Sequence, residues 1–231
     1  MASDNRLEEF VQILMSWSYR NLRDFPWRRT KNPYLILIAE VMLQRTRAEQ
    51  VVPVYVCFRR SFPKPQDLAE ASENAILNCI QSLGLRKRAS GLKRLAIQLV
   101  SDFEGRVPKT RKELIQLYGV GNYAANAVLS VAYEKNVPAI DANFARILKR
   151  VFSVETSAIP QKDENLALFA NNLVPYVDGK FKIFNWTLID FSNMICLPRT
   201  PKCPACPLKS ICHYSAVILR KKRSGREISG D

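Results

Sequence analysis

The sequence has a single histidine, His213, which stands next to a cysteine. A lone histidine in that position is too isolated to take part in a catalytic relay. The opening residues, MASDNRLEEF, lack the basic and then apolar segments of a secretory signal, and no apolar run is long enough to span a bilayer. We therefore expect a cytoplasmic protein, associated with the nucleoid if its source is bacterial, that does not interact with a membrane.

The alternation of apolar and polar residues that marks half-buried strands is also missing, and so are internal repeats. Apolar residues instead recur at helical spacing, as at Leu7, Phe10, Val11 and Leu14. The sequence therefore predicts an all-α fold. The expected helices cover residues 7–17, 35–54, 68–71, 75–81, 87–103, 142–152, 165–174 and 184–195, and residues 23–34 are expected to form a connection with exposed aromatic side chains.

Acidic residues are few relative to basic ones, with 21 Asp and Glu against 35 Lys and Arg, which gives a net charge of +14. Apolar residues make up 47% of the 231 residues, so the chain is globular and long enough for one domain or two small lobes. A basic excess of this size indicates a polyanionic partner, most simply nucleic acid. A basic, merely soluble surface is the alternative.

Two glycines, Gly119 and Gly121, separate two helical segments, the first of which opens with Thr110 and Glu113 in the spacing of a capping box. This arrangement predicts a helix, a tight hairpin and a second helix. The glycines let the chain turn sharply and leave the backbone of Gly119, Val120 and Gly121 accessible to a DNA phosphate. An ordinary turn between two helices is the alternative.

Two acidic residues stand in apolar surroundings. Asp141 follows an apolar loop shortly after the hairpin and is either a catalytic carboxylate or simply the N-cap of the helix over residues 142–152. Glu40 interrupts the apolar run of residues 35–43, where burial predicts a raised pKa and a role as a general acid or in positioning water. For Glu40 the alternative is a narrow exposed stripe of that helix. A phosphate-binding hairpin followed closely by a carboxylate indicates chemistry performed on DNA.

Four cysteines near the end of the chain have the spacing C-x6-C-x2-C-x5-C, namely Cys196, Cys203, Cys206 and Cys212. Four thiolates in so short a segment can hold a tetrahedral zinc ion or a [4Fe–4S] cluster, and the presence of only one C-x2-C pair favours iron–sulfur. Arg199 and Lys202 place positive charge in this loop, which makes it a candidate phosphate contact. The remaining cysteines, Cys57 and Cys79, lie in apolar helical segments and are interpreted as core residues.

The motifs L-x-G-V-G-x-Y-x-A and V-P-x-x-D, followed by the four-cysteine loop, resemble the endonuclease III superfamily of DNA glycosylases. The resemblance extends over residues 23–212, with a departure at Tyr118, where the family usually has proline. It implies two helical lobes that flank a DNA-binding cleft, into which one nucleotide of a bent duplex is extruded. A six-helix barrel with the hairpin would span residues 23–135, and a lobe with one [4Fe–4S] cluster per chain would combine residues 1–22 with 136–213. We expect the basic residues 214–231 to form a disordered tail.

The resemblance also implies roles for individual residues. Asp141 matches an essential aspartate, and a carboxylate there stabilises the cationic sugar formed when the N-glycosidic bond breaks. Tyr123 stands where bifunctional members have a lysine, and because tyrosine cannot form an imine, the product is an abasic site without β-lyase cleavage. Gln44 matches the residue that fills the gap left by the flipped nucleotide, and Arg45 is placed to contact the orphaned base.

Glu40, within A-E-V-M-L-Q-R-T, narrows the resemblance to the MutY-type and Mig-type mismatch glycosylases. The MutY type removes adenine and usually has a further C-terminal domain, which we do not expect here. It also tends to have a glutamine in place of Trp186, whose indole cannot make the paired contacts of an amide with adenine. The segment RDFPWRRT resembles the Mig type more closely. We therefore expect thymine or uracil opposite guanine to be excised, with adenine opposite guanine or 8-oxoguanine as the alternative, in a pocket that includes Ala48, Asn143 and Trp186.

The expected partner is double-stranded DNA with a mismatched or deaminated base, bound by a monomer. Two other classes of protein stay open. A non-catalytic DNA-binding module would use the hairpin and the basic surface alone, but it would gain nothing from Glu40 and Asp141. An iron–sulfur redox protein would require an electron partner, which the sequence does not indicate.

Overall fold

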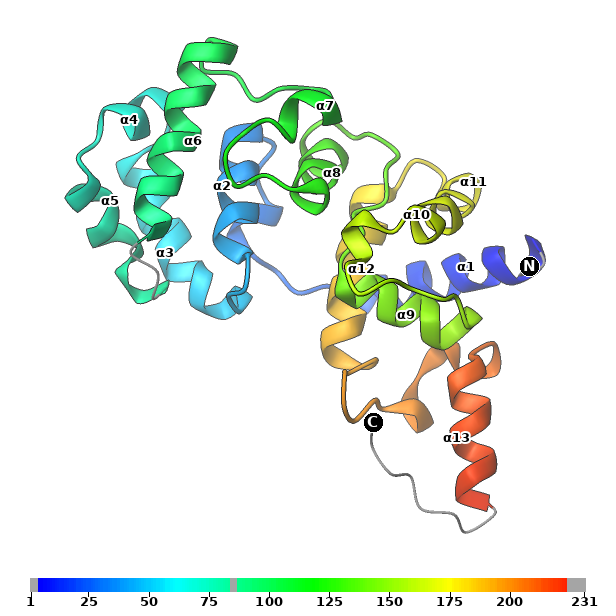
Figure 1. The fold of residues 1–231 in the computed structure, drawn as a ribbon. Helices are drawn as coiled ribbons and strands as arrows, with labels where there is room; N and C mark the ends of the chain where they lie inside the picture. Colours follow the sequence, from blue (N-terminus) through cyan, green and yellow to red (C-terminus); the bar gives the residue numbers. More distant parts are fainter. Residues whose placement is uncertain (1–3, 84–86, 224–231) are drawn as a thin grey trace. The chain divides into compact units, whose positions relative to one another are not determined.

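The computed structural model describes residues 4–83 and 87–223. Within these ranges the chain forms α-helices, short 3₁₀-helices and no β-strand, so the all-α prediction is confirmed (Figure 1). The chain divides into two compact units, a central unit of Asp24–Lys135 and a flanking unit that combines Met1–Arg23 with Asn136–Asp231. None of the described helices has both the length and the low polarity that a membrane span requires.

The central unit is organised around α2, a helix that is apolar on nearly every side. Its residues Ile36, Leu37, Ile38 and Met42 are at most 2% exposed, as is typical of a helix in the middle of a core. It packs against α3 and α8. In order, the elements are η1 (Pro26–Arg28), α2 (Pro33–Leu43), α3 (Ala48–Ser61), α4 (Pro65–Glu70), α5 (Glu73–Ile80), η2 (Gln81–Leu83), α6 (Lys87–Phe103), α7 (Arg111–Leu114) and α8 (Asn122–Ala132).

The break between α2 and α3 corrects the prediction of one helix over residues 35–54. The chain leaves the helix at Gln44, and Arg45 takes a left-handed conformation with φ of 59°. A left-handed residue cannot continue a right-handed helix, and α3 begins only after Arg47. The turn therefore presents Gln44 and Arg45 outward, and both are exposed.

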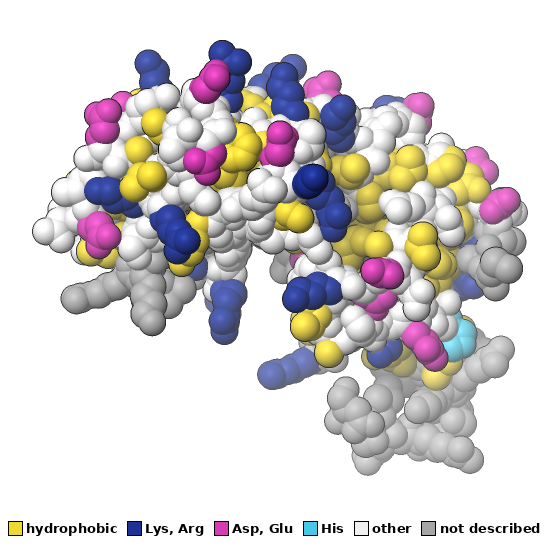
Figure 2. Space-filling view, turned by 45° about the horizontal axis from the view of Figure 1, so that its top comes forward, with side chains coloured by type: hydrophobic (Ala, Val, Ile, Leu, Met, Phe, Trp, Pro, Cys, Tyr) yellow, Lys and Arg dark blue, Asp and Glu magenta, His cyan; other side chains and the backbone are white. Residues whose placement is uncertain are grey.

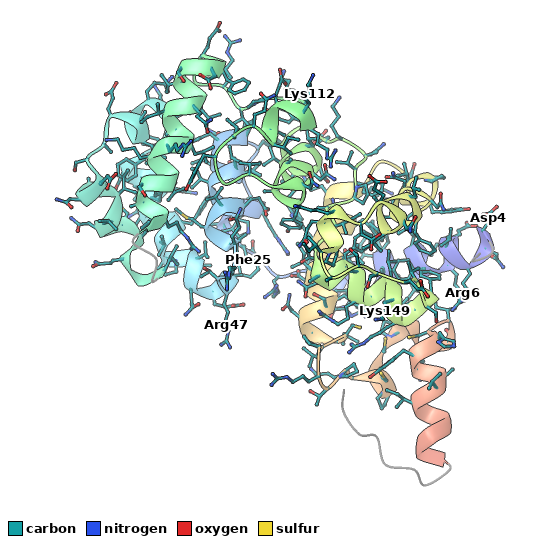
Figure 3. All side chains as sticks on the ribbon, in the orientation of Figure 1. Asp4, Arg6, Phe25, Arg47, Lys112 and Lys149 are labelled. Carbon is teal, nitrogen blue, oxygen red and sulfur yellow. The ribbon has the colours of Figure 1, made fainter. Side chains whose placement is uncertain are left out.

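The connection before α2 is not exposed as predicted. Phe25, Trp27 and Tyr34 are between 4% and 7% exposed. The rings of Phe25 and Trp27 stack with centroids 4.8 Å apart, and Trp27 meets Tyr55 edge to face at 5.6 Å. The position of Phe25 in this connection can be seen in Figure 3. The prolines of this segment interrupt helical periodicity, so the inward direction of its aromatic side chains was not visible in the sequence.

The flanking unit has its own core, in which aromatic side chains from distant parts of the chain meet. The ring of Phe10 contacts Phe152 and Phe184 edge to face, at 5.1 and 6.4 Å. Its elements are α1 (Asp4–Asn21), α9 (Ala142–Phe152), η3 (Pro160–Lys162), α10 (Glu164–Asn171), α11 (Val174–Val177), α12 (Phe181–Met194), η4 (Cys203–Ala205), η5 (Pro207–Ser210) and α13 (His213–Arg223).

Helix α13 corrects the expectation of a disordered tail over residues 214–231. The segment is helical to Arg223, and residues 224–231 lie outside the described residues. Its first turn is anchored, because Ser215 is 1% exposed and the guanidinium of Arg150 lies 4.8 Å from the ring of Tyr214. Arg6 of α1 also donates hydrogen bonds to the carbonyls of Val151 and Ile211, at 2.8 and 2.6 Å (Figure 3). The prediction of disorder rested on the basic composition alone, which gives no information about these contacts at and just before the first turn of α13.

Candidate nucleic-acid interface and catalytic acids

The predicted hairpin is formed by α7, the loop that follows it and α8. The hydroxyl of Thr110 accepts a hydrogen bond from the amide of Glu113 at 3.3 Å and so caps α7. Gly119 has a φ of +77°, in the left-handed region that glycine enters without strain. Gly121 is the N-cap of α8 and has no side chain to cover the amides of the first turn. The loop therefore ends at an exposed helix N-terminus, which attracts anions.

The space around the two glycines is open. A Cβ atom added at Gly119 or Gly121 would meet no heavy atom within 4 Å. Val120 between them differs, since its side chain is 6% exposed and its amide donates to the carbonyl of Leu117 at 3.1 Å. Val120 therefore anchors the hairpin from inside, while the backbone at the two glycines is accessible to a phosphate.

Tyr118 replaces the expected proline and fastens the hairpin to α6. Its ring lies 4.6 Å from the guanidinium carbon of Arg94, and its amide donates to Oε1 of Gln98 at 2.6 Å. A Cβ atom at Gly91 would come within 2.9 Å of the Tyr118 ring, so the ring rests against α6 at its glycine. The hairpin is thus held by packing where the family usually has the rigidity of proline.

Gln44 lies in the same unit as the hairpin and is hydrogen-bonded to its backbone. Its Nε2 donates a hydrogen bond to the carbonyl of Gly119 at 2.8 Å. The turn that carries Gln44 is held by Arg88 of α6, which donates to the carbonyls of Met42 and Gln44 and to the hydroxyl of Thr46, at 3.0, 2.8 and 3.1 Å. Sequence reasoning missed Arg88, because nothing local marks a basic residue whose acceptors lie more than forty positions earlier.

Glu40, Ala48 and Tyr123 also belong to the central unit. Glu40 is 8% exposed on α2, so its predicted burial is confirmed and the alternative of an exposed stripe is wrong. Ala48 opens α3 and Tyr123 lies in the first turn of α8, and both are half-buried. Because α8 packs along α2, the acid and the hairpin are parts of one packed body.

Asp141 caps α9 in the flanking unit. Its Oδ1 accepts from the amide of Phe144 at 2.8 Å, and its Oδ2 accepts from Nδ2 of Asn143 at 2.7 Å. Burial raises the pKa of Asp141 above its ordinary value, and the hydrogen bonds from Phe144 and Asn143 act in the opposite direction. The N-cap interpretation is therefore confirmed. A capped carboxylate is also fixed in direction, as a catalytic role would require.

A second layer of hydrogen bonds supports Asp141. Arg146 donates from Nη1 to Oδ1 of Asn143 at 3.1 Å, from Nε to the carbonyl of Cys196 at 3.1 Å and from Nη2 to the carbonyl of Ser192 at 3.2 Å. Asp141, Asn143 and Arg146 thus form a continuous chain of polar contacts. The predicted base-pocket residue Asn143 accordingly holds the catalytic candidate in place.

The segment before Asp141 is positioned by Asn185 of α12. Its Oδ1 accepts from the amide of Ala139 and its Nδ2 donates to the carbonyl of Val137, both at 3.1 Å. Trp186, the next residue, is half-buried, and the ammonium group of Lys182 lies 5.5 Å from its ring. Sequence reasoning missed Asn185, because its contact with residues 137–139 cannot be read from spacing along the chain.

Further along α12, Asp190 is fully buried and pairs with Arg23. Nε of Arg23 lies 2.8 Å from Oδ1 of Asp190, and the amide of Arg23 donates to Oδ2 at 2.9 Å. A buried carboxylate of this kind is stable only with such partners. The pair joins the segment just after α1 to α12 within the flanking unit.

The four-cysteine loop lies between α12 and α13 and is hydrogen-bonded by the guanidinium of Arg150 on α9. Arg150 donates to Sγ of Cys196 at 3.4 Å, and to the carbonyls of Leu197 and Pro198 at 2.7 and 2.6 Å. The thiol of Cys212 donates to the carbonyl of Arg150 at 3.4 Å. Arg199 and Lys202 are exposed on this loop, as a phosphate contact requires. Basic side chains also stand out elsewhere on the surface (Figure 2).

The thiols of the loop influence one another electrostatically. Burial raises the pKa of Cys206 to about 12, and Cys212, Cys196 and Cys203 add to the rise. In the described ranges no three His, Cys, Asp or Glu side chains are drawn together closely enough to hold a metal ion. Four mutually interacting thiols on one short loop nevertheless form a donor set that suits a thiophilic metal centre.

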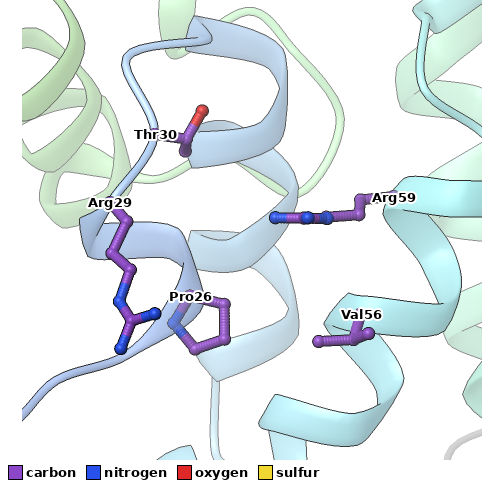
Figure 4. Close-up of a pocket in the computed structure, with 5 residues that line it drawn as sticks. All are labelled: Pro26, Arg29, Thr30, Val56 and Arg59. Carbon is purple, nitrogen blue, oxygen red and sulfur yellow. The ribbon is translucent and has the colours of Figure 1, made fainter.

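One open pocket of about 390 Å³ lies in the central unit, lined by Pro26, Arg29, Thr30, Val56 and Arg59 (Figure 4). It contains none of the predicted site residues. Arg29 is engaged by a salt bridge with Asp24. The pocket is therefore not formed by the residues to which the sequence assigned a function.

The helical fold, the exposed helix N-terminus behind a glycine hairpin, the buried Glu40 and the half-buried Asp141 are features of a DNA-binding protein equipped for chemistry. The chain belongs to the HhH-GPD superfamily of base excision DNA repair proteins, whose sequence profile matches residues 38–174.

Individual relatives agree with this assignment. The chain is 37% identical to the thymine/uracil-DNA glycosylase of Methanothermobacter thermautotrophicus over 214 residues, which cover 92% of this chain and 96% of that protein. It is 34% identical to the adenine DNA glycosylase of Buchnera aphidicola (subspecies Baizongia pistaciae) over 88% of this chain but only 57% of that protein. The solved structure of a thermostable thymine-DNA glycosylase superposes with a TM-score of 0.88 at 37% identity, covering 94% of this chain and all of the other.

Proposed function

We propose that the protein is a monofunctional DNA glycosylase that excises thymine or uracil opposite guanine and leaves an abasic site. The observation that carries this proposal is the identity of 37% with a thymine/uracil-DNA glycosylase along nearly the full length of both chains. The adenine glycosylase of Buchnera, by contrast, is matched over little more than half of its length. Trp186 adds support, because an indole cannot pair with adenine as an amide can.

In the proposed reaction the two carboxylates have different roles. Asp141 acts in its ionised form and stabilises the positive charge that develops on the sugar, with the amide of Phe144 and Nδ2 of Asn143 fixing its two oxygens. Glu40, buried on α2, is suited to protonate the leaving base or to orient water. Tyr123 offers no amine, so the sugar is not attacked through an imine.

DNA binding is assigned to backbone and basic groups. The open backbone at Gly119 and Gly121 receives a phosphate at the N-terminus of α8. Gln44 and Arg45, exposed on the turn after α2, enter the gap left by the flipped nucleotide and contact the orphaned base. Arg199 and Lys202 add phosphate contacts on the four-cysteine loop. The protein acts as a monomer on duplex DNA with a mismatched or deaminated base.

Cys196, Cys203, Cys206 and Cys212 would hold a [4Fe–4S] cluster in the proposed enzyme. When bound, the cluster supplies a structural crosslink that stiffens the basic loop. Arg150 of α9 already binds the carbonyls of Leu197 and Pro198, and so orients the loop from outside. Brown protein with absorbance near 400 nm and four irons per chain is the expected result, whereas colourless protein with one zinc per chain would contradict this part of the proposal.

Excision from four matched duplexes tests the proposed substrate. Duplexes containing T:G, U:G, A:G or A:8-oxoG are incubated with the protein, and abasic sites are cleaved with alkali. We expect strand cleavage for T:G and U:G only, and no cleavage before alkali is added. Cleavage restricted to the adenine strands would establish the alternative. Binding of all four duplexes without excision would establish a non-catalytic module.

A further inference from the structure

Two cysteines outside the four-cysteine loop lie side by side in the central unit. Cys57 is on α3 and Cys79 is on α5, and their Sγ atoms are 2.9 Å apart. Cys57 is exposed and Cys79 is half-buried, so the prediction that both are core residues is wrong. The reason is geometric: Cys57 follows the buried Val54 and Tyr55 on α3 but falls on the outer side of the helix.

We propose that Cys57 and Cys79 form a reversible disulfide that joins α3 to α5, a modification site independent of the four-cysteine loop. A disulfide requires a sulfur separation of about 2.05 Å, so only a small shift of two side chains separates the thiols from the bonded state. The two helices already pack against each other. The thiol of Cys79 also lies 3.6 Å from Oγ of Ser61, which keeps it at the contact between the helices.

The oxidant that completes the reaction is a small disulfide such as oxidised glutathione. The thiolate of exposed Cys57 attacks one sulfur of that molecule, forms a mixed disulfide and releases one glutathione thiolate. The thiolate of Cys79 then attacks the sulfur of Cys57 and expels the second glutathione. Two electrons and two protons pass from the pair to glutathione, and one S–S bond is gained by the protein. Burial and the hydrogen bond with Cys57 raise the pKa of the Cys79 thiol, so the second step should accelerate as the pH rises and more of Cys79 becomes thiolate.

Closing this bond would stabilise the central unit. The linked residues are 22 positions apart, so the crosslink limits the conformations of the unfolded chain between them. It connects α3, which packs on α2, with α5, which packs on α6. Oxidation should therefore raise the urea midpoint for unfolding of the central unit, and reduction should return it to its original value.

Peptide mapping of the folded, full-length protein tests the proposal. The protein is equilibrated with oxidised glutathione, its free thiols are alkylated, and it is digested with trypsin, which cuts after Arg59 and Arg60 and so separates Cys57 from Cys79. We expect a Cys57–Cys79 linked peptide that disappears on reduction with dithiothreitol, together with a higher urea midpoint. The variant Cys79→Ser should instead accumulate glutathione on Cys57, because it lacks the second thiol.

Two results would overturn the proposal. One is wild-type protein in which both cysteines are alkylated, or in which glutathione persists on Cys57 while Cys79 is alkylated. The other is an equal, oxidation-dependent rise in the urea midpoint of the double variant Cys57→Ser, Cys79→Ser, since that variant retains only the cysteines of the loop. Excision by the reduced double variant should equal that of wild type, so this test is separate from the test of the proposed function.

Discussion

The N-cap role of Asp141 and the catalytic role proposed for it make different electrostatic demands. As the N-cap of α9, Asp141 needs only a hydrogen-bond acceptor, whereas in the proposed reaction its carboxyl group must be ionised. The position of Asp141 between an apolar loop and the helix over residues 142–152 was enough to predict the N-cap. The support from Asn143, Arg146 and Asn185 was not predictable, because these contacts depend on how α9 and α12 pack and not on any local pattern.

Replacing Asp141 with asparagine should separate the two roles. Asparagine can still accept a hydrogen bond and cap α9, but it has no charge to stabilise the sugar cation. We expect excision by Asp141→Asn to fall by about 10²–10³-fold while duplex affinity is kept. Single-turnover excision and equilibrium DNA binding measure the two effects.

Asp163 provides the matched control. It caps α10 by accepting from the amide of Leu166 at 2.9 Å, and the amides of Ser157 and Leu166 hold its pKa below the ordinary value, the reverse of Asp141. The variant Asp163→Asn should retain wild-type excision. A rate for Asp141→Asn within threefold of wild type would exclude the catalytic role.

The proposed role of Asp141 also predicts how excision depends on pH. Because the pKa of Asp141 is raised, the wild-type rate should decline with falling pH through a midpoint above 3.8, the ordinary value for aspartate.

At the scale of elements, the periodicity of apolar residues and the positions of glycine and proline predicted most of the helices. The helices over 87–103 and 142–152 begin and end where the sequence predicted them. The break between α2 and α3 did not follow, because the run over residues 35–54 is helical in pattern and the turn at Arg45 is held by Arg88 from another helix. The residue pattern of one segment carries no information about a side chain of another helix that contacts it.

The two glycines of the hairpin should respond differently to substitution. Gly119 has a left-handed φ, so Gly119→Ala should lower the free energy of unfolding by about 1 kcal/mol and also weaken DNA binding. Gly121 has a φ of −95°, and a methyl group there meets no protein atom within 4 Å. Gly121→Ala should therefore leave stability unchanged and weaken binding alone, because the methyl group occupies the space where a phosphate approaches. Urea unfolding and duplex titration distinguish the two variants, and unchanged binding for both would argue for an ordinary turn.

Arg88 should be essential to the turn that carries Gln44. The variant Arg88→Ala removes donors to two carbonyls and one hydroxyl, so we expect a loss of about 1–3 kcal/mol in the free energy of unfolding. Excision should also decline, because the turn no longer holds Gln44 against the carbonyl of Gly119. Arg60→Ala, at an exposed position at the end of α3, is the control for loss of one positive charge. Equal effects of the two variants would show that charge alone matters.

For the whole molecule, composition predicted the kind of partner but not where it binds. The net charge of +14 indicates nucleic acid, and the exposed basic residues of the turn after α2 and of the four-cysteine loop agree with that expectation. Charge does not distinguish one base from another, because phosphate contacts position a duplex without reading its sequence. In the proposed enzyme base selection is therefore assigned to the predicted pocket residues, Trp186 among them, and not to the net charge.

Affinity and selectivity should therefore respond differently to salt. The logarithm of the binding constant should fall linearly with the logarithm of salt concentration, by about 0.9 for each phosphate contact, and with similar slopes for T:G and fully paired duplexes. The preference for T:G over the paired duplex should change little with salt, because the proposed function assigns it to contacts with the extruded base and not to phosphate contacts. Titrations of both duplexes with Asp141→Asn, which binds without cleaving, measure the slopes and the ratio together. A preference that disappears as salt rises would mean that electrostatic contacts, and not the pocket, select the mismatch.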